Sequence, residues 1–142
     1  MFDDDDFELP DDLAAMADAA GAALAGMGEE FAAGAQADAG TMKGHLENAA
    51  QSSDDAAFIK HVGLAFGIAH DLKGQGGTFG YTLVTDIAEH LCTLSRPQNN
   101  PARDTLPLMQ ACAQALYDVL AGRIEGDGGD MGQRLRHELG LS

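Results

Sequence analysis

The feature that most constrains the fold is an apolar stripe at helical spacing in the middle of the chain. Five apolar residues recur there at intervals of four or three: Phe58, Val62, Ala65, Ala69 and Leu72. At about 100° per residue, these positions share one face of an α-helix. The stripe therefore predicts a helix over residues 54–75 that buries this face in a core.

Similar apolar repeats predict helices along most of the remaining chain. Each repeat lies between glycine, proline or polar residues that can end a helix. The predicted helices cover residues 10–27, 29–51, 54–75, 79–95, 104–121 and 131–139. The composition is rich in alanine, lacks tryptophan and has few β-branched runs, and it favours helices over sheet.

Local signals place the helix boundaries. Gly28 is expected to separate the first two helices, and a kink or split near Gly40 and Thr41 stays open. The polar residues expected to cap the later helices are Ser52 or Ser53, Thr78 and Asp104. Gly76 and Gly77 are expected to end the helix over 54–75.

Four of these helices are similar in length and are joined mostly by short connections, which makes sequential neighbours antiparallel. The expected fold is all-α: an antiparallel four-helix bundle with an extra N-terminal helix and a short C-terminal helix. Residues 1–9 are expected to form a flexible acidic tail, and residues 10–142 a single helical domain.

The net charge narrows the classes of partner. The chain carries 23 acidic residues against 8 lysines and arginines, a formal charge of −15. Such a field repels nucleic acids and anionic membranes, so neither is an expected partner. No apolar run approaches the roughly 20 residues of a membrane span, and the N-terminus is acidic where a secretory signal is basic. We expect a cytoplasmic protein, with Cys92 and Cys112 as reduced core cysteines outside any CxxC motif.

One histidine, His70, has an unusually bare surface around it on the predicted helix. Four glycines lie three, four or seven positions away: Gly63, Gly67, Gly74 and Gly77. Each glycine inside a helix costs about 1 kcal/mol relative to alanine, so the pattern indicates a purpose other than stability. Another protein could close over the imidazole, and Lys73 at i+3 offers a cation for a phosphoryl group. We therefore expect a nucleophilic histidine that carries a phosphoryl group.

The same segment resembles a known signature. The order His70-x-Leu72-Lys73-Gly74, followed by Gly80, is similar to the motif of histidine-containing phosphotransfer (HPt) domains. The resemblance covers about residues 54–95. It implies that His70 is the phosphoacceptor and that Lys73 compensates the charge of the phosphoryl group. Attack through Nε2 is expected because it is the more exposed ring nitrogen of a histidine on a helix. The residues that would form the partner docking face are Gly63, Phe66, Gly67, Gly74 and Gly77.

The resemblance also implies the partners. The chain has no ATP-binding signature and no receiver-type cluster of carboxylates, so it cannot make its own phosphoryl donor. We expect a monomeric phosphocarrier that takes the group from a (hybrid) histidine kinase or a receiver phosphoaspartate and passes it to a response-regulator receiver domain. It needs no cofactor of its own, and Mg²⁺ is expected on the partner receiver.

Other interpretations stay open beside this one. The chain could be a non-catalytic interaction module that binds and inhibits a receiver or kinase, or a detached fragment of a chemotaxis-type kinase. Phe66 could edge the docking face or lie only in the core, and for Phe79 the core is favoured. A metal site is not expected, because no histidine follows a glutamate at Glu-x-x-His spacing. The GDGGD segment at 126–130 lacks the pattern of a P-loop or an EF-hand and is expected to be a flexible turn.

Overall fold

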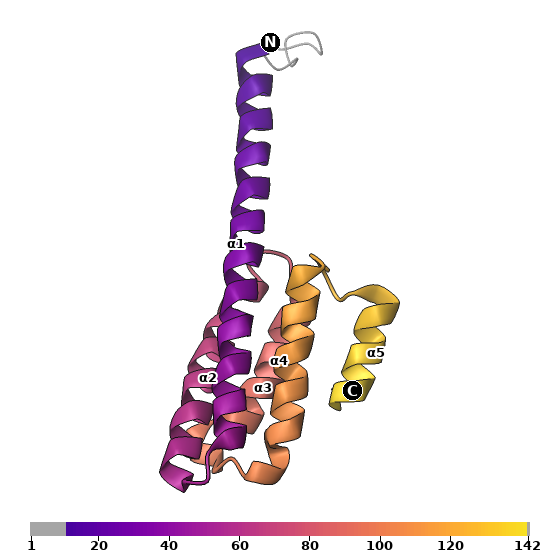
Figure 1. Cartoon of the computed structure of the whole chain (residues 1–142). Coiled ribbons are helices and arrows are strands. Elements are labelled where there is room, and N and C mark those ends of the chain that lie inside the picture. The colour runs from indigo at the N-terminus through magenta and orange to yellow at the C-terminus, as the bar shows by residue number, and fades with distance from the viewer. Residues whose placement is uncertain (1–10, 142) are drawn as a thin grey trace. The chain divides into compact units, whose positions relative to one another are not determined.

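The computed structural model describes residues 11–141, and helices form most of this range (Figure 1). The α-helices are α1 (Asp11–Gln51), α2 (Asp55–Gly76), α3 (Thr82–Ser95), α4 (Leu106–Ala121) and α5 (Gly129–Leu139). Two 3₁₀ turns, η2 (Pro97–Asn99) and η3 (Arg103–Thr105), lie between α3 and α4. The described residues contain no strand, so the all-α prediction is confirmed. The predicted tail at residues 1–9 lies outside them.

The chain divides into two compact units, Met1–Phe31 and Ala32–Ser142. The described part of the first unit is helical and belongs to α1. The predicted break at Gly28 is wrong, because residues 11–51 are one helix. Gly28 and Gly40 keep negative φ angles, and a helix tolerates such a glycine at a cost of about 1 kcal/mol.

The core of the second unit is built from four apolar helix faces. On α2 the predicted stripe is confirmed, since all five of its residues are at most 4% exposed. The other buried faces comprise Ala32, Ala35, Ala39, Met42, Leu46 and Ala49 on α1, Leu83, Val84, Ile87, Ala88 and Leu91 on α3, and Met109, Ala113, Leu116 and Leu120 on α4. Helix α3 packs against both α2 and α4. Contacts of α1 with α2 and α4 include the stacked rings of His45 and His61 and the Lys43 ammonium 4.7 Å from the Tyr117 ring centroid.

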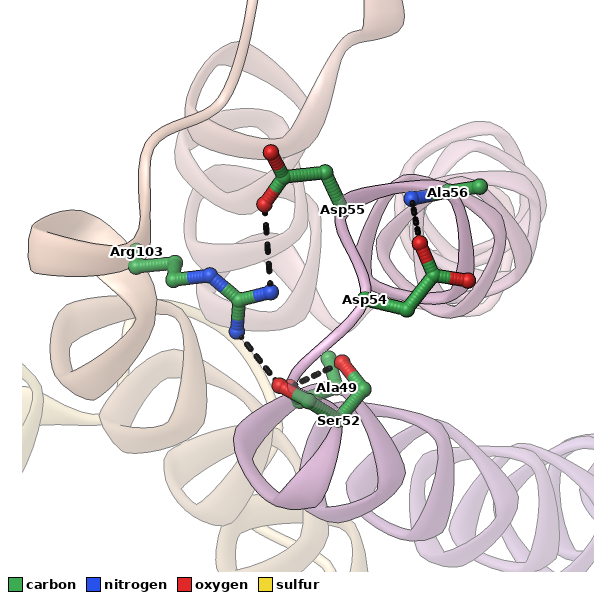
Figure 2. Close-up of polar contacts among 6 residues, drawn as sticks. All are labelled: Ala49, Ser52, Asp54, Asp55, Ala56 and Arg103. Atoms are coloured by element: carbon green, nitrogen blue, oxygen red, sulfur yellow. Dashed lines mark hydrogen bonds and ion pairs between the residues drawn. The ribbon is translucent and has the colours of Figure 1, made fainter.

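The N-terminus of α2 is capped by Asp54, whose side chain accepts a hydrogen bond from the Ala56 amide at 3.1 Å (Figure 2). The predicted caps, Ser52 and Ser53, are therefore wrong. The Ser52 hydroxyl instead donates to the Ala49 carbonyl oxygen at 2.8 Å, which satisfies one of the free carbonyls at the end of α1.

Arg103 ties this α1–α2 turn to the α3–α4 connection (Figure 2). Its Nη1 donates to the Ser52 carbonyl oxygen at 2.7 Å, and its Nη2 lies 3.4 Å from Asp55 Oδ1. The guanidinium carbon also lies 4.6 Å from the centre of the Phe58 ring, at cation–π distance. The polar segment 95–104 thus contributes a long-range clamp at the first turn of α2.

The α2–α3 turn ends α2 with a Schellman motif. The Tyr81 amide donates to the Gly76 carbonyl oxygen at 2.8 Å and the Gly80 amide to the Gly77 carbonyl oxygen at 3.3 Å, with Gly80 at φ +83°. Helix α2 ends at Gly76 with Gly77 as its C-cap, as predicted, and Gly77 keeps a right-handed helical conformation. Thr78 is therefore not the N-cap of α3, which begins at Thr82 after Tyr81.

The α4–α5 connection is hydrogen-bonded to this turn. The Gly126 amide donates to the Gly80 carbonyl oxygen at 2.7 Å, and the Leu83 amide donates to the Gly126 carbonyl oxygen at 2.9 Å. In the GDGGD segment, Gly126, Gly128 and Gly129 all have positive φ. The segment is thus a defined turn, with positions where glycine is strongly preferred.

The start of α4 differs from prediction in its cap, although Pro107 lies in the first turn as expected. Asp104 belongs to η3, and the N-cap position is held by Thr105 without a side-chain hydrogen bond. An ion pair between Arg136 and Asp86 links α5 to α3. Among the described residues, no helix combines the length and apolarity needed to cross a membrane.

Candidate functional site

His70 lies on the exposed side of α2, next to the buried face that anchors the helix. Its neighbours Ala69 and Leu72 are fully buried, whereas His70 and Asp71 are exposed. Within the described residues, neither ring nitrogen of His70 has a hydrogen-bond partner. The core contacts of α2 therefore hold the backbone of His70 in place and leave its imidazole accessible to solvent.

The glycines before and after His70 leave this surface open. A Cβ atom built on Gly63, Gly67 or Gly74 would meet nothing within 4 Å apart from the neighbouring backbone of its own helix. A shallow hollow runs along this part of α2, and its lining includes Gly63, Phe66, Gly67 and His70. The predicted bare surface is thus present at these three glycines, and no helix of the second unit covers it.

The last two glycines of the helix have different surroundings. Gly77 is exposed, but a Cβ there would lie 3.7 Å from Thr85 Oγ1, at the edge of the α2–α3 contact. Gly76 is buried, and a Cβ there would lie 2.7 Å from Thr85 Oγ1 and 3.1 Å from the Tyr81 carbonyl oxygen. Close approach of the α2 and α3 backbones therefore requires glycine at position 76.

Phe66 connects His70 to a cation that the sequence did not point to. The Phe66 and His70 rings are tilted at 46° with centroids 6.1 Å apart, and Phe66 is half-buried. The Arg96 guanidinium carbon lies 6.0 Å from the Phe66 ring centroid, at the limit of a cation–π contact. Phe66 thus belongs to both the α2 surface and the α2–α3 seam. Phe79, for which the core was favoured, is half-buried in the α2–α3 turn.

Lys73 lies one turn after His70 and is half-buried. Its charge and that of Arg96 both act on Cys92 of α3, whose thiol pKa is raised by burial and is lowered in part by these two cations. In the described part of the chain, neither Lys73 nor Arg96 forms an ion pair. Two cations without a carboxylate partner therefore lie on the α2–α3 side of the His70 surface.

An apolar cavity of about 250 Å³ adjoins the same surface at Gly63. It lies between the first half of α2 and the α3–α4 connection, and Phe58, Ile59, Val62, Pro97 and Pro101 are among its lining residues. Ile59, at its rim, is 59% exposed. The surface before His70 is therefore apolar, whereas the surface after it carries Lys73.

These features suit the transfer of an anionic group between proteins. An accessible imidazole is a nucleophile, the open glycine surface leaves room for a second protein, and Lys73, one turn after His70, offers a cation for negative charge on a group bound to the ring. No set of three or more histidine, cysteine or acidic side chains is placed to hold a metal among residues 11–141.

No protein-family model, curated protein or solved structure matches the chain. The geometry around His70 and the resemblance of its motif are therefore the grounds for assigning a function.

Proposed function

We propose that the chain is a histidine phosphotransfer protein that carries a phosphoryl group on His70 between signalling partners. The observation that carries this proposal is the exposed imidazole of His70 on a helix face from which side chains are missing at Gly63, Gly67 and Gly74. Lys73 and Arg96 add positive charge on one side of that face. The domain would be an antiparallel four-helix bundle of the HPt type, formed by residues 32–51 of α1 with α2, α3 and α4.

The chemistry follows from the nucleophile. The unprotonated nitrogen of a neutral imidazole attacks the phosphorus of a receiver aspartyl phosphate, and a nitrogen–phosphorus bond forms. The bond between phosphorus and the aspartate oxygen breaks, and the carboxylate leaves with the electron pair. The other ring nitrogen keeps its proton, so the ring carries a positive charge until that proton passes to solvent. The reverse reaction delivers the group to the next receiver.

The roles of the partners are complementary. A receiver domain would supply Mg²⁺ and most of the charge stabilisation, since the described residues offer cations but no metal site. Lys73, one turn after His70, would hold the phosphoryl group while it stays on the ring, and Arg96 would add positive charge farther away, beside Phe66. The proposed partners are response-regulator receiver domains and a (hybrid) histidine kinase, in the cytoplasm.

The test is phosphotransfer to the purified protein from receivers carrying radiolabelled phosphoaspartate. Label should appear on wild-type protein and on His137→Gln, in which another exposed histidine is replaced, but not on His70→Gln. The label should be acid-labile and alkali-stable, as expected for a phosphoramidate. Wild-type labelling of folded His70→Gln would refute the assignment.

The same experiment distinguishes the alternative function. A non-catalytic module would bind the receiver, in an assay such as isothermal titration calorimetry, without accepting label at His70. Binding without labelling by any phosphorylated receiver or kinase tried would favour that function.

A further inference from the structure

The first unit carries an apolar stripe that has no role in the proposed phosphotransfer. On α1 the stripe comprises Leu13, Met16, Ala20, Leu24 and Met27. These positions recur at intervals of three or four and fall within about 80° of the helix circumference. The four large side chains are exposed by 44%, 66%, 67% and 52% in order of position. A face of this width usually packs against another element.

Outside the stripe, all the charged side chains of this segment are acidic. Residues 11–31 contain five acidic residues and no lysine or arginine, and residues 1–10 contain five more acidic residues. Asp12, Asp18 and Glu30 are exposed at positions outside the stripe. The first unit therefore carries a formal charge of −10, two thirds of the −15 of the whole chain.

This charge selects among the possible occupants of the stripe. A second copy would bring another ten negative charges alongside the first ten, without a single lysine or arginine in residues 1–31 to offset them. An anionic membrane surface is disfavoured for the same reason. A partner with basic residues beside its own apolar stripe would match both the apolar stripe and the negative charge of this segment. Apolar contacts would supply affinity, and charge complementarity would supply orientation.

We propose that residues 11–31 are a docking helix for a basic amphipathic helix of another protein. Next to the stripe lie Ala17, Gly21 and Gly28, where small residues let a partner approach the backbone, and a Cβ on either glycine would meet no atom within 4 Å. This site shares no residue with the His70 surface and does not depend on phosphotransfer.

The test uses the full-length protein and two synthetic 21-residue helical peptides as probes. Both peptides have leucine in a matching stripe; one carries lysine at the flanking positions and the other glutamate. In fluorescence anisotropy at low salt, the lysine peptide should bind at least about tenfold more tightly than the glutamate peptide, and the preference should shrink at high salt.

Matched variants locate the site on the chain. The double variant Leu24→Gln/Met27→Gln removes apolar surface without changing charge and should weaken binding of the lysine peptide at least about tenfold. Ala22→Gln, at an exposed position opposite the stripe, should leave binding unchanged. Circular dichroism checks that the variants retain helix, and labelling of His70 by a receiver should be the same in both.

Four results would overturn the proposal. The first two are that the lysine peptide fails to bind at millimolar concentration, or that the two peptides bind equally. The third is that Ala22→Gln loses as much binding as the double variant. The fourth is that the protein forms a concentration-dependent dimer that the double variant abolishes. The last result, measured by sedimentation equilibrium, would assign the stripe to a second copy of the chain.

Discussion

Substitution of Gly67 should separate stability from function, because this glycine lies one turn before His70 on an open helix face. A Cβ at position 67 meets no atom within 4 Å, so alanine fits without any rearrangement. Alanine is favoured over glycine in a helix by about 0.5–1 kcal/mol. In a domain of this size, that gain should raise Tm by roughly 2–6 °C.

The same methyl group should slow phosphotransfer if a receiver docks on this face. Adding one methyl to a well-packed surface costs about 1–3 kcal/mol, which corresponds to a roughly fivefold or greater loss of rate. Gly67→Leu should nearly stop transfer while keeping its helix content. The measurements are thermal melting by circular dichroism and the initial rate of label transfer from a phosphorylated receiver.

Gly44→Ala on α1 is the matched control. A Cβ at position 44 also meets no atom within 4 Å, so this variant should be stabilised by a similar amount while its transfer rate stays unchanged. Transfer by Gly67→Leu at the wild-type rate would refute docking on this face. Unfolding of Gly67→Leu would show that another helix packs there, against the open surface described above.

Three further predictions address the α2–α3 turn, the cations near His70 and Phe66, and the buried Cys112 thiol. Gly80→Ala should destabilise the domain by about 1–2 kcal/mol, measured by urea unfolding, because φ at this position is +83°. Lys73→Ala should slow transfer to His70 by about tenfold or more without abolishing it, and Arg96→Ala should slow it less, whereas Arg134→Ala on α5, the control, should transfer at the wild-type rate. Burial raises the pKa of the Cys112 thiol from 9.0 to about 12, so its stabilising contribution is fully present below pH 9 and is lost as pH rises toward 12. Unfolding free energies measured between pH 8 and 11 should fall less steeply for Cys112→Ala than for wild type; equal slopes would contradict the burial of this thiol.

The apolar repeats at helical spacing predicted most of the helical structure. The α2 stripe from Phe58 to Leu72 was predicted residue by residue, because a five-residue repeat at helical spacing has few alternatives. Gly28 misled the prediction because glycine ends a helix only where the backbone adopts another conformation or a cap forms. Alanines and glutamates around Gly28 favour continuation, and the residues there stay helical.

Caps were less predictable because several residues offered the same local chemistry. Ser52, Ser53 and Asp54 are all good N-cap types, and the choice depends on where α1 ends. The Ser52 hydroxyl bonds back to Ala49, which leaves Asp54 as the cap. At the other end of α2, Gly76 and Gly77 were correctly predicted to end the helix, but local spacing did not show that the left-handed residue is Gly80.

Only the part of the candidate site that lies on α2 could be predicted from the sequence. His70, Lys73 and the open glycines follow from spacing on α2, since i+3 and i+4 neighbours share a helix face. Arg96 lies 26 residues after His70 and comes near Phe66 only through the packing of α2 against α3. The sequence gives no local signal for such a meeting, and segment 95–104 lies between two predicted helices.

The structure explains how a helix with so many glycines can stay ordered. Gly63, Gly67 and Gly74 each cost about 1 kcal/mol in helix propensity, all of it on the exposed face. The buried face of α2 is untouched by these glycines, and both ends of the helix are held from outside. Arg103 binds the first turn from the α3–α4 connection, and Gly126 holds the last turn through Gly80. Long-range contacts at the two ends of α2 therefore offset the helix-propensity cost of the glycines in its middle. As a result, the surface beside His70 can lack side chains while α2 stays folded.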